Sequence, residues 1–408
     1  MRVVWPTSRG WVLLIGSLLW FLVALVNQKP LPALFATGGL ALALASFFST
    51  LMSLQNLRVT RGAVGDAATG NAVHMPLVVE NLSRRRRQDI VVRENCPFAT
   101  ESLHTVVVPS LSRLESRLVN RRILAMKRGE FDLGDVVLRG GDPAGLFYRE
   151  SVFHLPRRAL IVPGTEPLTS LNLQPRPNMS GATGTPLSIA GTSQEFYGIR
   201  EYNPTDGLRH IHWKSSARFR RLMVREFERN AVTSAAILVD ANRRFVSGNQ
   251  QWSNLEYQIR AAASIAQHLS SLYCQVAFAA GGARPLIMPF QAASQALPTI
   301  LYELAVLEQG NVSLPEVAYE LGARLEAGTI VFCLSLSTSK PVSDALQILS
   351  ERGLIIRWLC ADRKAFAPQP WRNRPATRRT ARRLRDLPFP VVDLHPDRSL
   401  AGALAHAD

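Results

Sequence analysis

The sequence has little cysteine and few of the short motifs on which common enzymes depend. Four cysteines are spread along 408 residues, at Cys96, Cys274, Cys333 and Cys360. They are too few and too scattered for a disulfide scaffold, and no C-x-x-C pair exists for zinc or redox chemistry. A reducing compartment is therefore the simpler expectation. A Walker loop, a G-x-S-x-G turn and an H-E-x-x-H motif are missing as well. No motif supports catalysis, so we expect that the protein is not an enzyme.

Lysine is the second scarce residue, because only five of the 47 basic residues are lysine and the rest are arginine. Against 31 acidic residues this gives a formal net charge of +16. A hydrophobic content of 47% with 19% charged residues excludes wholesale disorder, and the length allows two or three domains. The apolar residues are unevenly distributed, and this distribution determines the class of protein.

Two long uncharged runs stand near the N-terminus, at Gly10–Val26 and Leu31–Leu54. As helices rising ~1.5 Å per residue they would extend about 25 Å and about 36 Å, which suits the ~30 Å hydrocarbon core of a bilayer. Only four residues separate them, so residues 1–54 are predicted to form a transmembrane helical hairpin. The alternative is a cleaved signal peptide followed by a buried helix, but the apolar region of a signal peptide is usually shorter, at ~7–15 residues.

The charges beside these runs predict their orientation. Arg2 and Arg9 precede the first run, Arg58 and Arg61 follow the second, and the turn between the runs contains only Lys29. Arginine on both outer flanks favours both ends on the cytoplasmic side. We therefore expect a two-span protein of the cytoplasmic membrane, with both termini and the soluble domains in the cytoplasm.

A strand-rich pattern follows the apolar runs. Residues 55–164 contain short β-branched runs separated by Gly, Pro, Asn and Asp, which predicts an all-β, sandwich-like domain. The arginine run 84–87 falls between two strands and is more simply a solvated hairpin tip, although a tip facing a bilayer would attract anionic lipid. Residues 165–194 are rich in Ser, Thr, Pro and Gly and are predicted to be a linker.

Strands and helices alternate in residues 231–400. Apolar strand patterns occur at 235–240, 273–280, 329–335 and 354–362, and helical patterns include 252–273 and 291–307. Uninterrupted apolar strands that alternate with helices predict an α/β doubly wound domain with a mostly parallel sheet. Ligands of such domains normally bind at the carboxyl ends of the strands.

A dense segment of charged and aromatic residues, 195–230, lies before the α/β domain. Residues 203–207 (NPTDG) form a strong turn, because proline fixes φ and glycine accepts a positive φ. Cations crowd around Trp213 after the turn, and we interpret Trp213 as a buried side chain within an ion-pair network that includes Glu201 and Asp206. An amphipathic connector with solvated charges is the alternative.

The spacing F-x-x-I-R-E-Y-x-P-x-D-x-x-R-x-I-x-W-K-x-x-A-R, read over residues 196–218, resembles the signature of the family known as domain of unknown function fifty-eight. The D-P-x-G-L-F sequence at 142–147 and the two-run N-terminus resemble the same family. The signature residues, to which we assign partner binding, are Arg200, Glu201, Tyr202, Asp206, Arg209, His212, Trp213, Lys214 and Arg218.

The resemblance implies a membrane anchor, a strand-rich middle domain and a C-terminal domain similar to the von Willebrand factor A domain. It also implies two partners, an AAA+ ATPase of the MoxR type and a transglutaminase-like membrane protein. A von Willebrand factor A domain holds Mg²⁺ through D-x-S-x-S, a threonine and a further aspartate. Here Asp240 is in place, Asn242 and Arg244 replace the two serines, and Ser313 stands where threonine would be expected.

This degenerate set, Asp240, Asn242 and Ser313, is a poor match to the oxygen ligands that Mg²⁺ requires. Arginine cannot ligate a cation and repels one, so we expect no metal and no other cofactor. An Arg244–Asp240 ion pair in place of the ion is a hypothesis.

The last feature is a basic patch at residues 371–385. Anionic lipid or an acidic protein is favoured as its partner over nucleic acid, because Trp371 is the only stacking residue nearby. Taken together, the sequence predicts a membrane-anchored, non-catalytic scaffold that presents a von Willebrand factor A-like domain to cytoplasmic partners. The alternative is a metal-dependent protein-binding module that uses the degenerate site at Asp240.

Overall fold

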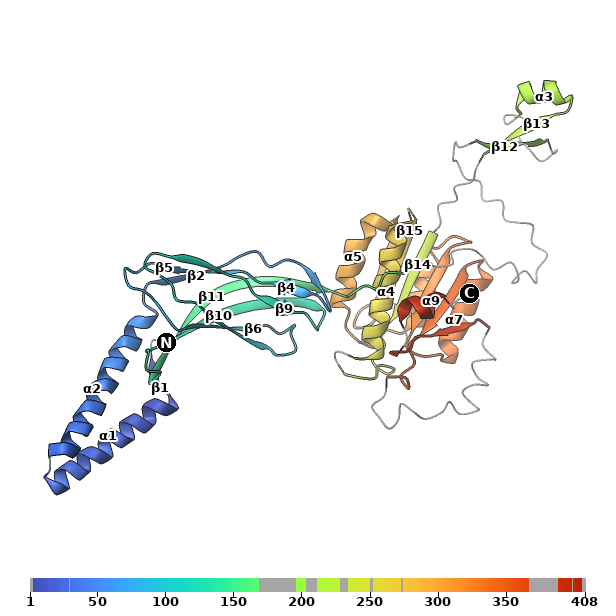
Figure 1. The fold of residues 1–408 in the computed structure, drawn as a ribbon. Coiled ribbons are helices and arrows are strands. Elements are labelled where there is room, and N and C mark those ends of the chain that lie inside the picture. The colour runs from blue at the N-terminus through green and yellow to red at the C-terminus, as the bar shows by residue number, and fades with distance from the viewer. Residues whose placement is uncertain are drawn as a thin grey trace.

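The computed structural model describes residues 3–28, 30–168, 196–202, 211–227, 234–249, 252–272, 274–366, 388–397 and 399–405. Most of the predicted linker, the basic patch at 371–385, and Asp206 and Arg209 lie outside these ranges. The described chain consists of two apolar N-terminal helices followed by a body rich in β-sheet (Figure 1).

The prediction of two long apolar helices is confirmed, with bounds α1 (Ser8–Asn27) and α2 (Pro30–Ser53). Both are long and apolar enough to cross a membrane. Thr7 caps the start of α1 by accepting a hydrogen bond from the Gly10 amide at 3.1 Å. The Thr7 hydroxyl in turn donates to the Gly145 carbonyl at 2.7 Å. This contact joins the first helix to a loop 138 residues further along the chain.

The middle part of the chain is a set of mainly antiparallel sheets. Its strands are β1 (Val4–Pro6), β2 (Leu57–Arg61), β3 (Ala67–Ala68), β4 (Ala72–His74), β5 (Leu77–Asn81), β6 (Ile90–Asn95), β7 (Leu103–Val108), β8 (Ser116–Val119), β9 (Arg122–Leu124), β10 (Gly129–Gly141) and β11 (Phe147–Val162). The largest sheet has the order β1-β11-β10-β6-β7, and two smaller sheets have the orders β2-β5-β8 and β4-β9. Alternating buried and exposed residues, as in β5 and β6, pack these sheets around two apolar clusters.

A buried ion cluster lies inside this β-domain. The Glu94 side chain is fully buried and contacts two guanidinium groups, those of Arg61 and Arg121, whose side chains are 4% and 1% exposed. One carboxylate therefore contacts two buried cations and compensates the charge of only one of them. Such a cluster is tolerated in a protein interior only while its charges remain paired.

A small unit follows, formed by β12 (Phe196–Glu201), α3 (Trp213–Phe219) and β13 (Met223–Phe227). β12 and β13 pair antiparallel, and Ile211 forms a bridge to Val224. We call residues 196–227 the signature unit, because the family signature falls within it.

The C-terminal part is a six-stranded sheet of order β16-β15-β14-β17-β18-β19. Its elements are β14 (Ser234–Asp240), α4 (Asn254–Ser270), β15 (Gln275–Gly281), β16 (Leu286–Ala292), α5 (Ala293–Val306), α6 (Leu314–Gly322), β17 (Ile330–Ser335), α7 (Lys340–Glu351), β18 (Ile355–Cys360), β19 (Val391–Asp393) and α9 (Leu400–Ala405). All neighbouring strands are parallel except the edge pair β15 and β16. Separate apolar clusters cover the two faces, one with α4, α5 and α9 and the other with α6 and α7.

The long hairpin of β10 and β11 connects the two ends of the molecule (Figure 1). At one end Phe147 lies against Phe47 of α2, with ring centroids 5.8 Å apart. At the other end, where Gly129 pairs with Ile161, β10 and β11 contact α5 of the C-terminal sheet. The hairpin therefore spans the distance between the apolar helices and the C-terminal domain.

Candidate functional site

The signature unit is organised by His212, which is a capping residue in the structure. His212 Nδ1 accepts a hydrogen bond from the Ser215 amide at 3.2 Å at the start of α3. The His212 amide donates to the Met223 carbonyl at 2.8 Å, and the Tyr202 amide donates to the Leu222 carbonyl at 2.9 Å. These hydrogen bonds hold α3 against the paired strands β12 and β13. His212 and Tyr202 therefore help to shape the unit through their local hydrogen bonds.

The interpretation of Trp213 as a buried side chain is wrong. Trp213 is 68% exposed, at the first position of α3, where the helix turns its outer face to solvent. Glu201 pairs instead with Arg221, at 3.2 Å between two exposed side chains. Lys214 and Arg218 are exposed on α3, while Asp206, Arg209 and the side chain of Arg200 lie outside the described residues. The structure thus brings Trp213, Lys214 and Arg218 together on one short helix.

The loop after β14, the loop that contains Gly310 and the loop after β17 meet at the carboxyl edge of the C-terminal sheet. Asn242 pairs with Gly310 in a parallel bridge, and Asp240 reaches the loop after β17. The carboxylate of Asp240 is 1% exposed and accepts two backbone hydrogen bonds, from Asn242 at 3.0 Å and from Leu336 at 3.2 Å. Burial raises the pKa of Asp240 to about 6, and the two backbone hydrogen bonds oppose that rise.

The side-chain oxygen atoms of the degenerate metal set have hydrogen-bond partners within the described protein. Both oxygens of Asp240 are used by backbone amides, Asn242 Oδ1 accepts from the Arg244 amide at 3.0 Å, and the Ser313 hydroxyl donates to Glu316 at 2.8 Å. The side chain of Arg244 lies beside Phe245, 5.9 Å from its ring centroid, and forms no ion pair with Asp240. The hypothesis of an Arg244–Asp240 pair is therefore wrong, because backbone amides satisfy the carboxylate.

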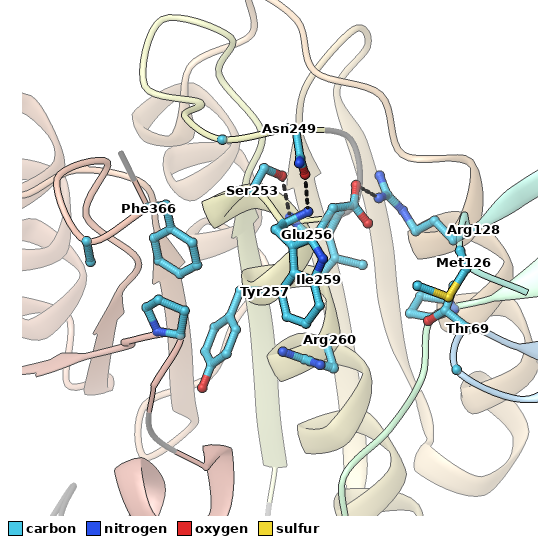
Figure 2. A pocket seen from close by; sticks show the side chains of 16 residues that line it. Thr69, Met126, Arg128, Asn249, Ser253, Glu256, Tyr257, Ile259, Arg260 and Phe366 are labelled. Atoms are coloured by element: carbon cyan, nitrogen blue, oxygen red, sulfur yellow. Dashed lines mark hydrogen bonds and ion pairs between the residues drawn. The ribbon is translucent and has the colours of Figure 1, made fainter. Parts of the chain in front are cut away.

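A cavity of about 600 Å³ lies close to this edge, between the β-domain and the C-terminal domain (Figure 2). One wall comes from the β-domain and includes Thr69, Met126 and Arg128. The other comes from the first turns of α4 and the segment after β18, with Tyr257 and Phe366 at 5.6 Å between ring centroids. The cavity is thus formed by segments that are distant in the sequence.

Arg128 joins the two walls of this cavity. Its guanidinium forms an ion pair with Glu256 in the first turn of α4. It also donates to the carbonyl of Leu304 at 2.8 Å and to the carbonyl of Leu307 at 2.6 Å, at the end of α5. Carbonyls at a helix C-terminus lack partners within the helix and carry partial negative charge, so a cation is favourable there. We call this group the Arg128 clamp.

Other polar side chains of the cavity also have contacts within the protein. Arg260 stacks over Tyr257 with 4.9 Å between its guanidinium carbon and the ring centroid, and its Nε lies 3.6 Å from Glu166. Burial, and then the charge of Glu166, raise the pKa of Tyr257. The Ser253 hydroxyl caps α4 by accepting from the Glu256 amide at 3.1 Å. Chemically, the cavity offers aromatic faces beside guanidinium groups, a combination suited to binding planar or anionic groups.

The sequence did not identify this cavity. Arg128 and Glu256 are 128 positions apart, and no pattern in the sequence relates one to the other. One signal was present, since Glu256 stands three residues after Ser253 in an S-x-x-E capping pattern. That pattern locates the start of α4 but does not reveal which arginine contacts it.

Comparisons with known proteins agree with the resemblance found in the sequence. Residues 198–366 match the family described as protein of unknown function DUF58. The chain is 26% identical over 224 residues to the uncharacterized protein YeaD of Bacillus subtilis (strain 168), covering 53% of this chain and 54% of that protein. The chain therefore spans about half the length of the curated relative that it matches.

Two solved structures are similar to part of the chain. Conserved hypothetical protein BatB from Bacteroides thetaiotaomicron is 11% identical, with a TM-score of 0.30 over 43% of this chain and 95% of that chain. An aerotolerance-related membrane protein from Bacteroides fragilis is 9% identical, with a TM-score of 0.30 over 43% of this chain and 96% of that chain. Scores this low do not establish a shared fold.

Proposed function

We propose that the protein is a membrane-anchored, non-catalytic scaffold that holds its C-terminal domain at a fixed position relative to the cytoplasmic membrane. The observation that carries the proposal is that the hairpin of β10 and β11 is attached at both ends. A chain whose domains were joined by a flexible linker would not need such attachments.

The end beside the apolar helices is attached by packing and by hydrogen bonds. Leu146 and Phe147 pack with Ala43 in a small apolar cluster that also includes residues of α1. Arg149 of β11 donates to the Leu51 carbonyl at 2.6 Å, in the last turn of α2. The cation lies where the helix carbonyls lack partners, which restricts how far α2 can rotate relative to the hairpin.

The other end is attached by the Arg128 clamp. The Arg128 side chain is 10% exposed and the Glu256 side chain 27%, so this ion pair is largely removed from water and is only weakly screened by salt. Three contacts from one side chain connect the β-domain to both α4 and α5. Together with the attachment at α2, they support a stiff connection between the apolar helices and the C-terminal domain.

The C-terminal domain in this proposal is a recognition module similar to the von Willebrand factor A domain. Parallel strands with helices on both faces, and three loops that meet at the carboxyl edge, support this assignment. The four buried free cysteines and the arginines on the outer flanks of the apolar runs support a cytoplasmic position for it.

The proposed partner is an AAA+ ATPase of the MoxR type, with a transglutaminase-like membrane protein as a second component of the system. The signature unit supplies the binding surface, since Trp213 and Phe219 are 68% and 54% exposed on one short helix beside Lys214 and Arg218. Exposed aromatic side chains flanked by cations are typical anchors of protein interfaces.

Capture of a purified MoxR-type ATPase by the detergent-solubilised full chain tests the proposal. Trp213→Ala should weaken capture about thirty-fold, because a tryptophan anchor is commonly worth about 2 kcal/mol or more. Trp252→Ala is the matched control, since Trp252 is 62% exposed but lies in the interdomain cavity. Capture that survives EDTA supports the scaffold, whereas capture lost with EDTA supports the metal-dependent module at Asp240. Equal capture by wild type and Trp213→Ala would contradict the role of the signature unit.

A further inference from the structure

A second cavity, of about 490 Å³, lies where α2 meets the β-domain. One side is formed by the last turns of α2, with Phe48 and Met52 exposed by 60% and 41%. The other side is formed by the turn between β5 and β6, with Arg85, Arg86 and Arg87. The cavity thus places an apolar helix surface directly beside three consecutive arginines. We call it the arginine cavity.

The backbone that carries these arginines is fixed by hydrogen bonds. Asn81 Nδ2 donates to the Arg85 carbonyl at 2.8 Å, and the Ser83 hydroxyl donates to the same oxygen at 3.0 Å. The backbone of Arg87 exchanges two hydrogen bonds of 2.8 Å with Leu111. The turn is therefore organised before any ligand arrives, which lowers the entropic cost of binding.

Arg87 is the innermost of the three and supports the helix. It is 7% exposed and donates to the carbonyls of Met52 and Gln55, the latter at 3.0 Å, at the end of α2. Burial, and then the nearby charge of Arg85, lower the pKa of Arg87. Its Nε–H is buried and has no hydrogen-bond partner among the residues that the structure describes. A cation in this position would gain from a nearby anion.

The two outer arginines have no carboxylate partner among the described residues. Arg86 donates to the Ser110 hydroxyl at 2.8 Å, and both Arg85 and Arg86 are exposed. Asp89 is the one acidic residue that lines the cavity, and it forms no ion pair within the described chain. Three guanidinium groups against one carboxylate leave an excess of positive charge that the described protein does not balance.

We propose that the arginine cavity binds the phosphate group of an anionic membrane lipid. This inference rests on the proposed membrane anchoring, and it names a lipid that the anchored end of the chain would select. α2 has 24 residues and extends about 36 Å, so its last turns reach the boundary of a ~30 Å hydrocarbon core. Lipid phosphates lie just beyond that boundary, beside Arg85 and Arg86, while Phe48 and Met52 face the acyl chains. A free phosphate ion would use the arginines but not this apolar wall.

The test is native mass spectrometry of the full chain in detergent, with phosphatidylglycerol or phosphatidylcholine added. Arg85→Gln combined with Arg86→Gln should lower the affinity for phosphatidylglycerol about thirty-fold, equivalent to about 1 kcal/mol for each removed charge. The matched control is Arg157→Gln combined with Arg158→Gln, which removes the same charge from exposed positions of β11 and should leave the affinity unchanged. Arg87 is left intact because it caps α2.

Several outcomes would overturn the assignment. Equal retention of the two lipids, or equal affinity of the two double variants, would show that the arginine cavity does not select an anionic headgroup. Inorganic phosphate that binds as tightly as phosphatidylglycerol and displaces it would assign the cavity to a free ion instead. Alkaline carbonate extraction of membranes separates this inference from the proposed function. Release of the wild-type chain would contradict membrane anchoring itself, whereas retention with no lipid preference would contradict the lipid site alone.

Discussion

Replacement of Arg128 by methionine is expected to loosen the connection between the β-domain and α5. Methionine keeps an apolar stem of similar length, so the main loss is that of the guanidinium contacts. The carbonyls of Leu304 and Leu307 would lose their donors, and Glu256 would remain without its cation. Each hydrogen bond that involves a charged group is worth about 1.5–3 kcal/mol, and breaking a buried ion pair costs about 3–5 kcal/mol.

These costs are not additive, and Glu256 can regain water because its side chain is 27% exposed. We therefore expect a loss of about 3 kcal/mol, at the lower end of the range for buried pairs. Hydrogen exchange of the full chain in detergent measures this loss of stability, because the last turn of α5 would open more often. Exchange of amides 304–307 should become about a hundred-fold faster.

Two variants control for this experiment. Arg158→Met removes an arginine from the same domain, but Arg158 is 76% exposed and its pairs with Glu130 and Asp132 are 3.5 Å long, so little change is expected. Glu256→Gln removes the charge but keeps both carbonyl contacts, and exchange should increase about ten-fold. If the exchange rates of amides 304–307 in Arg128→Met lie within three-fold of those in wild type, the proposed role of the Arg128 clamp is refuted.

Two further predictions concern buried carboxylates. Glu94→Gln leaves Arg61 and Arg121 buried without an anion, so we expect the free energy of unfolding to fall by about 3–5 kcal/mol. Urea denaturation measures this loss as a lower midpoint concentration. A change below about 1 kcal/mol would show that the cluster is not held together by charge. For Asp240, the pKa of about 6 in the folded protein exceeds the value of ~3.9 in the unfolded chain, so the folded protein binds the proton more tightly. The free energy of unfolding should therefore fall by about 2–3 kcal/mol as pH rises from about 4 to about 6. Hydrogen exchange of β14 against pH measures this slope, which Asp240→Asn should lack; an identical slope in both proteins would contradict the assignment.

Much of the fold followed from patterns with a strong physical basis. The apolar helices were found within a few residues of their bounds, because long uncharged runs have few alternative structures. The buried central strands of the C-terminal sheet were found for the same reason. The strand Leu286–Ala292 was missed, because it is half-exposed, lies antiparallel at the sheet edge and contains Pro289.

The candidate sites were less predictable than the elements that carry them. The composition around Trp213 suggested a buried network, but the exposure of a side chain depends on what packs over it, and α3 turns Trp213 outward. The Arg128 clamp joins residues that a single sequence gives no reason to pair. The expectation that the arginine run at 84–87 is a solvated hairpin tip is wrong for Arg87, which is 7% exposed and donates a hydrogen bond to the Met52 carbonyl of α2. The sequence alone does not indicate this contact, because it depends on how α2 packs against the β-domain.

The lengths of β10 and β11 have a consequence for where a partner could work. Sixteen residues of β11 at ~3.3 Å per residue measure about 50 Å, so with the apolar helices in a bilayer the C-terminal domain would stand well clear of the lipid surface. Apart from a register shift between Leu133 and Asp135, side chains alternate along most of the paired length, so changes by an even number of residues would preserve the packing of the sheet best. With the apolar helices in a bilayer, the distance of the domain from the lipid would change in steps of about 7 Å, and a soluble assembly would have to match that distance to reach it.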